Sequence, residues 1–135
     1  MSNQFKAKKI LIVEDNLLNQ KLMQMVVEKT GHKSIAVSDG SKAFDTAKKE
    51  KPALILLDIK LPEVSGIDIA KMIRKDPELK KTPIIVITSF ADKKERERIS
   101  KETNCDQYLT KPFLPDMLTK IIGNYLPIND QDLLL

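Results

Sequence analysis

The sequence predicts an α/β protein with a doubly wound, five-stranded parallel sheet and five helices. Short apolar runs alternate with stretches whose apolar residues recur at helical spacing, and short polar or proline-containing loops join them. The most informative run is 54–57, LILL, because four consecutive apolar residues fit a strand covered by helices on both faces. With right-handed crossovers, this alternation fits the sheet order 2-1-3-4-5.

The five expected strands are short runs that end at polar or turn residues. The runs 9–13, 54–57 and 84–88 are apolar and fit the centre of the sheet. The run 34–37 fits an edge strand, and 107–110 is a brief fifth strand. These five runs account for the sheet.

The expected helices lie between the strands. The first carries a set of apolar residues that we expect to pack on the sheet: Leu18, Leu22, Met23, Met25 and Val26. Gly31 follows its last turn. Later helices are expected around 43–47, at 66–75 and 92–102, and around 117–125. Pro52, Pro77 and Pro127 follow three of these helices, as residues that stop helices do.

Composition indicates one ordinary globular domain. The 135 residues are 41% hydrophobic and 31% charged, so the chain can bury a single core. We divide the chain into a tail at 1–8, a domain at 9–126 and a second tail at 127–135. The apolar runs are too short to cross a membrane and no signal-peptide pattern is visible, so we expect a cytoplasmic protein without a membrane partner.

Residue types exclude several kinds of site. The single cysteine, Cys105, has no CxxC motif or Cys/His cluster beside it, so neither a zinc site nor a redox pair is expected. The 23 basic and 19 acidic residues are mostly interspersed and aromatic residues make up 4%, so no nucleic-acid partner is expected. The single histidine, His32, follows Gly31 and is interpreted as a surface turn residue.

Acidic residues follow two strands that the predicted order makes neighbours. Glu14 and Asp15 follow the first strand and Asp58 follows the third, at the sheet edge where such folds bind ligands. Three close carboxylates repel one another unless a cation joins them, which predicts a Mg²⁺ site. Thr88 and Lys111 belong to the same edge, where a hydroxyl and an ammonium group would stabilise a transferring phosphoryl group.

These motifs together resemble the receiver domain of two-component response regulators, over nearly the whole chain. The matching residues are Glu14-Asp15, Asp58 in LLDIKLPEVSG, Thr88 in VITSF and Lys111-Pro112. The segments PEVSG and ITSFA are most similar to stand-alone receivers of the cell-cycle and cell-division type, and at this length we expect no effector domain. Receivers cut from hybrid kinases look alike too. The resemblance implies the flavodoxin-like receiver fold.

The resemblance also implies the chemistry of the site. Asp58 would be the phosphoacceptor, taking a phosphoryl group from a phosphohistidine of a histidine kinase or phosphotransfer protein. Thr88 and Lys111 would contact the phosphoryl oxygens. Mg²⁺ would be held by four residues: Asp15, Asp58, the backbone carbonyl of Lys60, and Glu14 through water. The protein would be a signalling receiver that catalyses its own phosphorylation and dephosphorylation, rather than a conventional enzyme.

Signalling would depend on a phosphorylation-dependent contact with a downstream protein. Tyr108 would be a switch aromatic that turns inward when Thr88 moves. The contact surface would lie on the fourth helix, the fifth strand and the fifth helix of a monomer or weak dimer. Lys60 and Phe90, each two positions beyond a site residue, would gate the approach of hydrolytic water.

Two other classes of function use similar residues. An aspartyl-phosphate phosphatase of the haloacid-dehalogenase type needs the same acid, hydroxyl, lysine and magnesium, but it carries a DxD motif on its first strand. A pseudo-receiver would bind a partner without being phosphorylated, although here every residue of the acceptor site is present.

Overall fold

The five strands form one parallel sheet in the order β2-β1-β3-β4-β5, which confirms the predicted doubly wound fold. The structure is a computed structural model that describes residues 5–89 and 92–129. Its strands are β1 Lys9–Val13, β2 Lys33–Val37, β3 Leu54–Leu57, β4 Ile84–Thr88 and β5 Gln107–Thr110.

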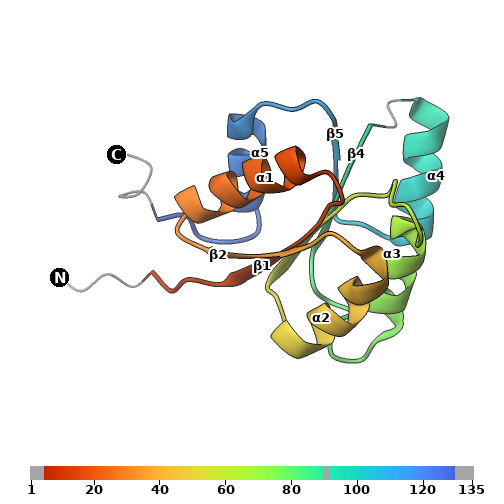
Figure 1. Ribbon diagram of the computed structural model, residues 1–135, viewed down its shortest axis with the longest axis horizontal. Coiled ribbons are helices and arrows are strands. Elements are labelled where there is room, and N and C mark those ends of the chain that lie inside the picture. Colours follow the sequence, from red (N-terminus) through yellow and green to blue (C-terminus); the bar gives the residue numbers. More distant parts are fainter. Residues whose placement is uncertain (1–4, 90–91, 130–135) are drawn as a thin grey trace.

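Helices cover both faces of the sheet (Figure 1). They are α1 Leu17–Lys29, α2 Ala43–Glu50 with the short 3₁₀ turn Gly40–Lys42 before it, α3 Gly66–Lys75, α4 Lys93–Thr103 and α5 Pro115–Gly123. One face carries α1 and α5, and the other carries α2, α3 and α4. In the part of the chain that the structure describes, no helix is long and apolar enough to span a membrane.

Alternating side chains of the central strands supply two separate cores. In β1, Ile10 and Ile12 pack with α1 and α5, whereas Leu11 and Val13 pack with α2 and α3 on the other face. All four are 0% exposed. Apolar residues are therefore needed at every position of a central strand, which explains why these strands do not alternate with polar residues.

The packed face of α1 agrees only in part with the expected one, because Met23 and Val26 are buried as expected. Leu18 and Met25 are 80% and 68% exposed, so the prediction that they pack on the sheet was wrong. The buried residues of the helix are Gln20, Met23, Val26 and Val27. The helix begins at the N-cap Asn16, directly after the β1 strand exit, and this short connection fixes which side of α1 meets the sheet.

His32 also departs from its predicted place. It is 3% exposed, because residues 5–8 and 127–129 pack around the turn that carries it. Its Nδ1 accepts from the backbone N–H of Lys8 at 2.9 Å, so Nε2 carries the proton and donates to the carbonyl of Pro127 at 2.6 Å. The prediction of a surface turn residue was wrong because these partners come from distant segments.

Candidate functional site

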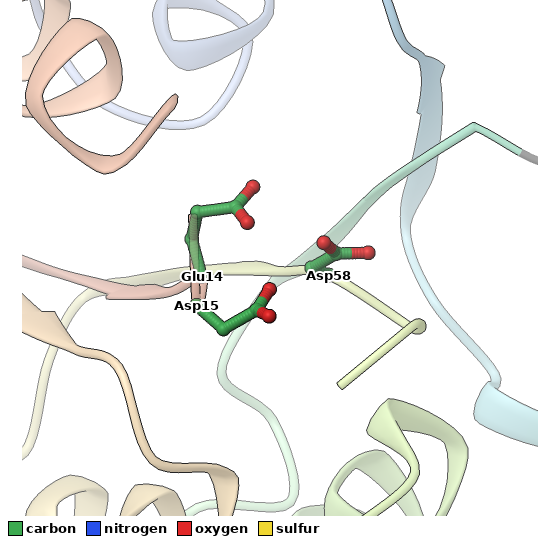
Figure 2. A group of neighbouring side chains, drawn as sticks. All are labelled: Glu14, Asp15 and Asp58. Carbon is green, nitrogen blue, oxygen red and sulfur yellow. The ribbon is translucent and has the colours of Figure 1, made fainter. Parts of the chain in front are cut away.

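The carboxyl ends of β1 and β3 lie side by side and carry the acidic residues. Val13 and Leu57 are register partners, and the next residues along the chain are Glu14 and Asp58. The three acids Glu14, Asp15 and Asp58 each offer a carboxylate oxygen, and these oxygens lie within 4.8 Å of one another. Figure 2 shows the carboxylates of Glu14 and Asp15 extending toward that of Asp58.

Asp58 is held at both carboxylate oxygens. It is 4% exposed, and its backbone N–H donates to Val13 of the neighbouring strand at 3.0 Å. Oδ1 accepts from the backbone N–H of Lys60 at 3.0 Å, and Oδ2 accepts from Nζ of Lys111 at 2.8 Å. The side chain is therefore fixed, with the ammonium group of Lys111 beside Oδ2.

Glu14 is the most buried acid of the group, at 1% exposed. Its Oε2 accepts from the backbone N–H of Asn16 at 3.1 Å, and its Oε1 accepts from Nζ of Lys111 at 2.5 Å. Burial raises the pKa of Glu14, and the hydrogen bonds from Lys111 and Asn16 offset only part of that effect. Burial alone would lower the pKa of Lys111, but its bonds to Asp58 and Glu14 outweigh it, and that pKa is raised.

Asp15 differs from the other two acids because it faces solvent. Within residues 5–89 and 92–129 its carboxylate has neither a hydrogen-bond donor nor an ion pair. An open carboxylate beside two held ones is a donor set that suits Mg²⁺, which takes a few carboxylates and keeps several waters. The residues present therefore fit a magnesium ion.

Thr88 lies at the end of β4 and carries an unusual hydroxyl. Its Oγ1 is buried and has no hydrogen-bond partner in the described chain. Its carbonyl accepts from the backbone N–H of Lys111 at 2.8 Å, which ties the two strand ends together. A buried hydroxyl without a partner costs free energy, and a bound group that accepts its hydrogen bond would remove that cost.

The loop after Asp58 closes tightly because residue 66 is glycine. A Cβ atom at Gly66 would lie 2.3 Å from the carbonyl oxygen of Asp58, closer than any side chain can sit. The Gly66 N–H donates to the carbonyl of Ile59 at 3.0 Å, and Ser65 caps α3 beside it. A larger residue at position 66 would push α3 away from the loop that follows Asp58.

Of the remaining predicted residues, Lys60 lies beside the acids and Tyr108 lines a separate groove. Lys60 is exposed next to Asp58. Tyr108 does not join the carboxylates: it is half-buried on β5 and lines a groove of about 450 Å³ with residues of α4, namely Lys93, Arg96, Glu97 and Ser100. Burial raises the pKa of Tyr108, although Arg96 opposes the effect. Phe90 lies outside the described residues.

Apolar side chains beside the site were missed by the sequence reasoning. Leu17, Leu18 and Leu114 are 62%, 80% and 68% exposed, and Met117 is 46% exposed. We call these four residues the apolar rim. They lie at the starts of α1 and α5, shortly after Asp15 and Lys111, on neighbouring helices (Figure 1). Their position directly after site residues was the available signal.

A hollow that is lined by Asn19 and Phe113, the chain neighbours of Leu18 and Leu114, reaches the site. A pocket of about 330 Å³ lies between α1 and the start of α5, and its lining residues are Asn19, Leu22, Ser89, Lys111, Pro112 and Phe113. Because Lys111 also contacts Asp58, this pocket and the acidic cluster share a residue. The pocket therefore lies next to the carboxylate of Asp58.

Comparison with known proteins identifies the family to which this chain belongs. Residues 10–123 match the model of the response regulator receiver domain. The chain is 41% identical over 119 residues to the polar-differentiation response regulator DivK of Brucella anthropi, covering 88% of this chain and 96% of that protein. The DivK protein of Brucella ovis matches with the same identity and coverage.

Solved structures with the same fold include other receivers. Chemotaxis protein CheY4 of Vibrio cholerae superposes with a TM-score of 0.83 at 26% identity, covering 90% of this chain and all of that one. The receiver domain of the sensor histidine kinase PA1611 of Pseudomonas aeruginosa, which has a magnesium ion in its active-site cleft, gives 0.81 at 30% identity, covering 89% and 98%. This chain belongs to the response regulator receiver domain family.

Proposed function

We propose that this receiver accepts a phosphoryl group on Asp58 from a phosphohistidine and that the transfer depends on Mg²⁺. The observation that supports this most strongly is the arrangement around Asp58. Its carboxylate is buried at a strand end, hydrogen-bonded to Lys111, and within reach of two further acids. Glu14 also contacts Lys111, but Asp58 is the one of the three acids that follows β3, the strand between β1 and β4.

The chemistry is a displacement at phosphorus. An oxygen of Asp58 attacks, the bond from phosphorus to the donor histidine nitrogen breaks, and the histidine leaves with the electron pair. Lys111, now shared between Glu14 and Asp58, would turn its positive charge to a phosphoryl oxygen. The unpartnered hydroxyl of Thr88 would donate to another.

The metal would be held by the acids at the strand ends. Asp15 and Asp58 would bind it through carboxylates, Lys60 through its carbonyl, and Glu14 through water. When bound, Mg²⁺ supplies positive charge that offsets the carboxylates and the incoming phosphoryl oxygens. The open carboxylate of Asp15 supports this assignment, as does the magnesium ion in the cleft of the Pseudomonas receiver.

The donor would dock on the apolar rim. Exposed leucines and a methionine on two neighbouring helices form a surface that a helical phosphohistidine protein can cover. Lys111 lines the pocket between α1 and the start of α5 and also contacts Asp58. The donor histidine would reach Asp58 through this pocket. Docking of this kind would select a protein donor and would leave small phosphodonors unaffected.

The output would pass through the groove between α4 and β5. Movement of Thr88 toward the phosphoryl group would free space into which Tyr108 turns, and the groove that Tyr108 lines would change shape. A downstream protein would then bind the phosphorylated form more tightly. Membership of the receiver family disfavours the phosphatase alternative, whereas the pseudo-receiver is an outcome of the test below.

The test is phosphorylation of the purified protein by acetyl phosphate, followed by intact-mass spectrometry. We expect a gain of one phosphoryl group with Mg²⁺, and none with EDTA, in Asp58→Asn or in Asp15→Asn. Phosphorylation of Asp58→Asn at the wild-type rate would show that another residue is the acceptor. A folded wild-type protein that takes up no phosphate from acetyl phosphate or from a competent kinase would be a pseudo-receiver.

A further inference from the structure

Gln20 is a polar residue on the face of α1 that otherwise packs on the sheet. It is 9% exposed, and the next residues on that face, Met23 and Val27, are 0% exposed. Burying a side-chain amide is unfavourable unless its polar atoms find hydrogen-bond partners. A glutamine at this position therefore needs partners inside the protein.

Both donors of the Gln20 amide are used. Nε2 donates to the backbone carbonyl oxygen of Glu14 at 3.0 Å and to Oγ of Ser38 at 3.0 Å. The first bond is buried and runs from α1 back to the turn that joins this helix to β1. The second holds the amide against the loop that follows β2. An amide nitrogen carries two hydrogens, so no donor remains for another partner.

The carbonyl that Gln20 holds belongs to the peptide group between Glu14 and Asp15. Because a peptide group is planar, fixing this carbonyl also fixes the backbone nitrogen of Asp15. The carboxylate of Asp15 has no protein partner in the described chain. Its position is therefore set mainly by the position of the Asp15 backbone. The backbone N–H of Glu14 donates to Val37 at 3.1 Å, so Gln20 and the β2 strand hold this turn from two sides.

We propose that Gln20 is a positioning residue for the magnesium site: its amide holds the Glu14–Asp15 peptide so that the carboxylate of Asp15 faces the ion. The inference rests on the proposed function, because it concerns the same acidic cluster. Residues that hydrogen-bond to metal ligands without touching the metal orient those ligands, and removing such a residue typically weakens metal binding by 10- to 100-fold. Gln20 touches the backbone of a ligand residue and neither the ion nor the phosphoryl group.

Gln24 offers a matched control on the next turn of α1. Its Nε2 donates to Oγ of Ser34 at 3.4 Å. This is a longer glutamine–serine bond than the one between Gln20 and Ser38, and it does not involve the acidic cluster. We would compare Gln20→Met and Gln24→Met, measuring Mg²⁺ affinity by NMR titration and the free energy of unfolding in EDTA. We expect Gln20→Met to weaken Mg²⁺ binding about tenfold and Gln24→Met to change it less than about twofold.

The outcomes separate this inference from the proposed function. A folded Gln20→Met protein with wild-type Mg²⁺ affinity overturns the role of Gln20, while a wild-type protein that binds no Mg²⁺ overturns the proposed magnesium site as well. If Gln20→Met does not fold, the wild-type protein still gives an answer. The side-chain amide resonances of Gln20 should shift on Mg²⁺ addition and those of Gln24 should not; unchanged Gln20 resonances overturn the inference.

Discussion

The ammonium group of Lys111 lies 2.5 Å from the carboxylate of Glu14, although 97 positions separate the two residues in the chain. The same ammonium contacts Asp58 at 2.8 Å, so one cation serves two buried acids. Because burial raises the pKa of Glu14 even with Lys111 beside it, the folded protein holds a proton on Glu14 more tightly than the unfolded chain does. The ionised carboxylate of Glu14 therefore opposes folding.

The first prediction is that Glu14→Gln stabilises the metal-free protein. Ionised Glu14 lowers the stability of the folded protein. This loss begins as the pH rises past 4.5, the ordinary pKa of glutamate, and reaches its full size above the raised pKa of the folded state. At pH 7 we expect Glu14→Gln to be more stable by about 1 kcal/mol. Near pH 4 both proteins are neutral at this position, and the difference should become small. Urea unfolding in EDTA at the two pH values measures it.

The same variant should lose Mg²⁺ affinity, because it removes a negative charge from the acidic cluster. Stability and metal binding would then change in opposite directions, as expected where a functional site holds like charges together. A Glu14→Gln protein that is less stable than wild type at pH 7 would mean that the ion pair with Lys111 outweighs the cost of burial.

The sheet could be predicted because each central strand is a continuous apolar run with a polar residue at its exit. Once the order 2-1-3-4-5 is known, parallel register brings Glu14 and Asp58 to neighbouring strand ends, and the structure shows that pair together with Asp15. The chemical roles of Thr88, Lys111 and the other residues of the site stay predictions.

The packed face of α1 could be predicted only in part, because two sets of residues fit a helical period and the expected residues came from both. Leu18, Leu22 and Met25 form one stripe, and Gln20, Met23 and Val27 form another. Apolar character favours the first set, yet the second is buried, since Gln20 finds its partners in the loops beside it. The exposed stripe then supplies part of the surface next to the site.

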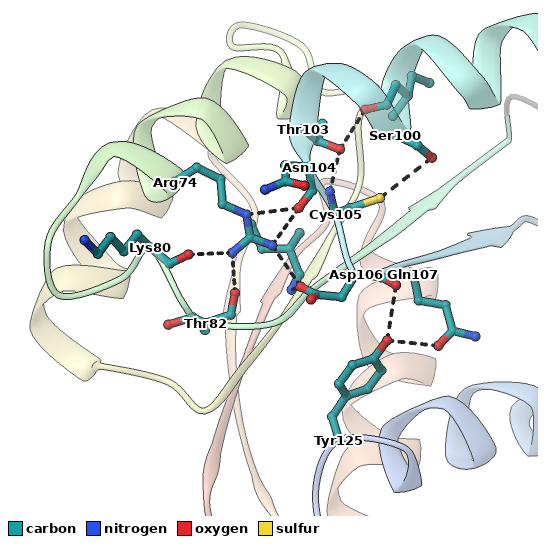
Figure 3. A network of polar contacts seen from close by, with 12 residues as sticks. Arg74, Lys80, Thr82, Ser100, Thr103, Asn104, Cys105, Asp106, Gln107 and Tyr125 are labelled. Atoms are coloured by element: carbon teal, nitrogen blue, oxygen red, sulfur yellow. Dashed lines mark hydrogen bonds and ion pairs between the residues drawn. The ribbon is translucent and has the colours of Figure 1, made fainter.

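A second prediction concerns Arg74 of α3, which ties the α3–β4 loop to the α4–β5 turn at the opposite end of the sheet (Figure 3). Its guanidinium donates to the carbonyls of Lys80, Thr82 and Asn104 and pairs with Asp106 at 2.8 Å. The side chain is only 15% exposed. Arg74→Met would remove this donor from the three carbonyls and the cation from Asp106, and we expect it to lower the free energy of unfolding by about 2 to 3 kcal/mol.

Arg98 is the matched control for this substitution. It pairs with Glu95 and Glu102 along α4, but its side chain is 51% exposed and water screens both pairs. Arg98→Met should change the free energy of unfolding much less than Arg74→Met does in the same denaturant titration. Equal effects of the two substitutions would show that the Arg74 network contributes no more than a surface ion pair.

The third prediction separates the docking of the donor from the chemistry. Leu18→Ser combined with Leu114→Ser removes apolar contact area from the rim without touching an acid or Lys111. We expect phosphotransfer from a phosphohistidine protein to slow about tenfold, because losing buried apolar contacts at an interface typically costs more than 1 kcal/mol. Phosphorylation by acetyl phosphate, which needs no docking surface, should keep its wild-type rate.

Met72 controls for the loss of any exposed apolar residue. It is 46% exposed on α3, on the other face of the sheet from the rim. Met72→Ser should leave transfer from both donors unchanged. If the rim variant transferred phosphate from the protein donor as fast as wild type, the donor would have to dock elsewhere.

The last prediction is that the phosphoryl group on Asp58 is long-lived when no phosphatase is present. Hydrolysis needs a water molecule oriented for in-line attack, and an acid or amide near the phosphoryl group is the usual means of orienting it. Lys60 is an exposed ammonium beside Asp58, and Phe90, which lies outside the described residues, is apolar. Neither side chain has an oxygen that accepts a hydrogen bond from water, whereas Asn at position 60 or Glu at position 90 supplies one that can hold the water. The combined variant Lys60→Asn with Phe90→Glu should therefore lose its phosphate several-fold faster than wild type, with Lys71→Asn on the exposed side of α3 as the control. Intact-mass spectrometry over time, after removal of acetyl phosphate, gives both rates, and hydrolysis no faster in the combined variant would rule out gating by these two positions.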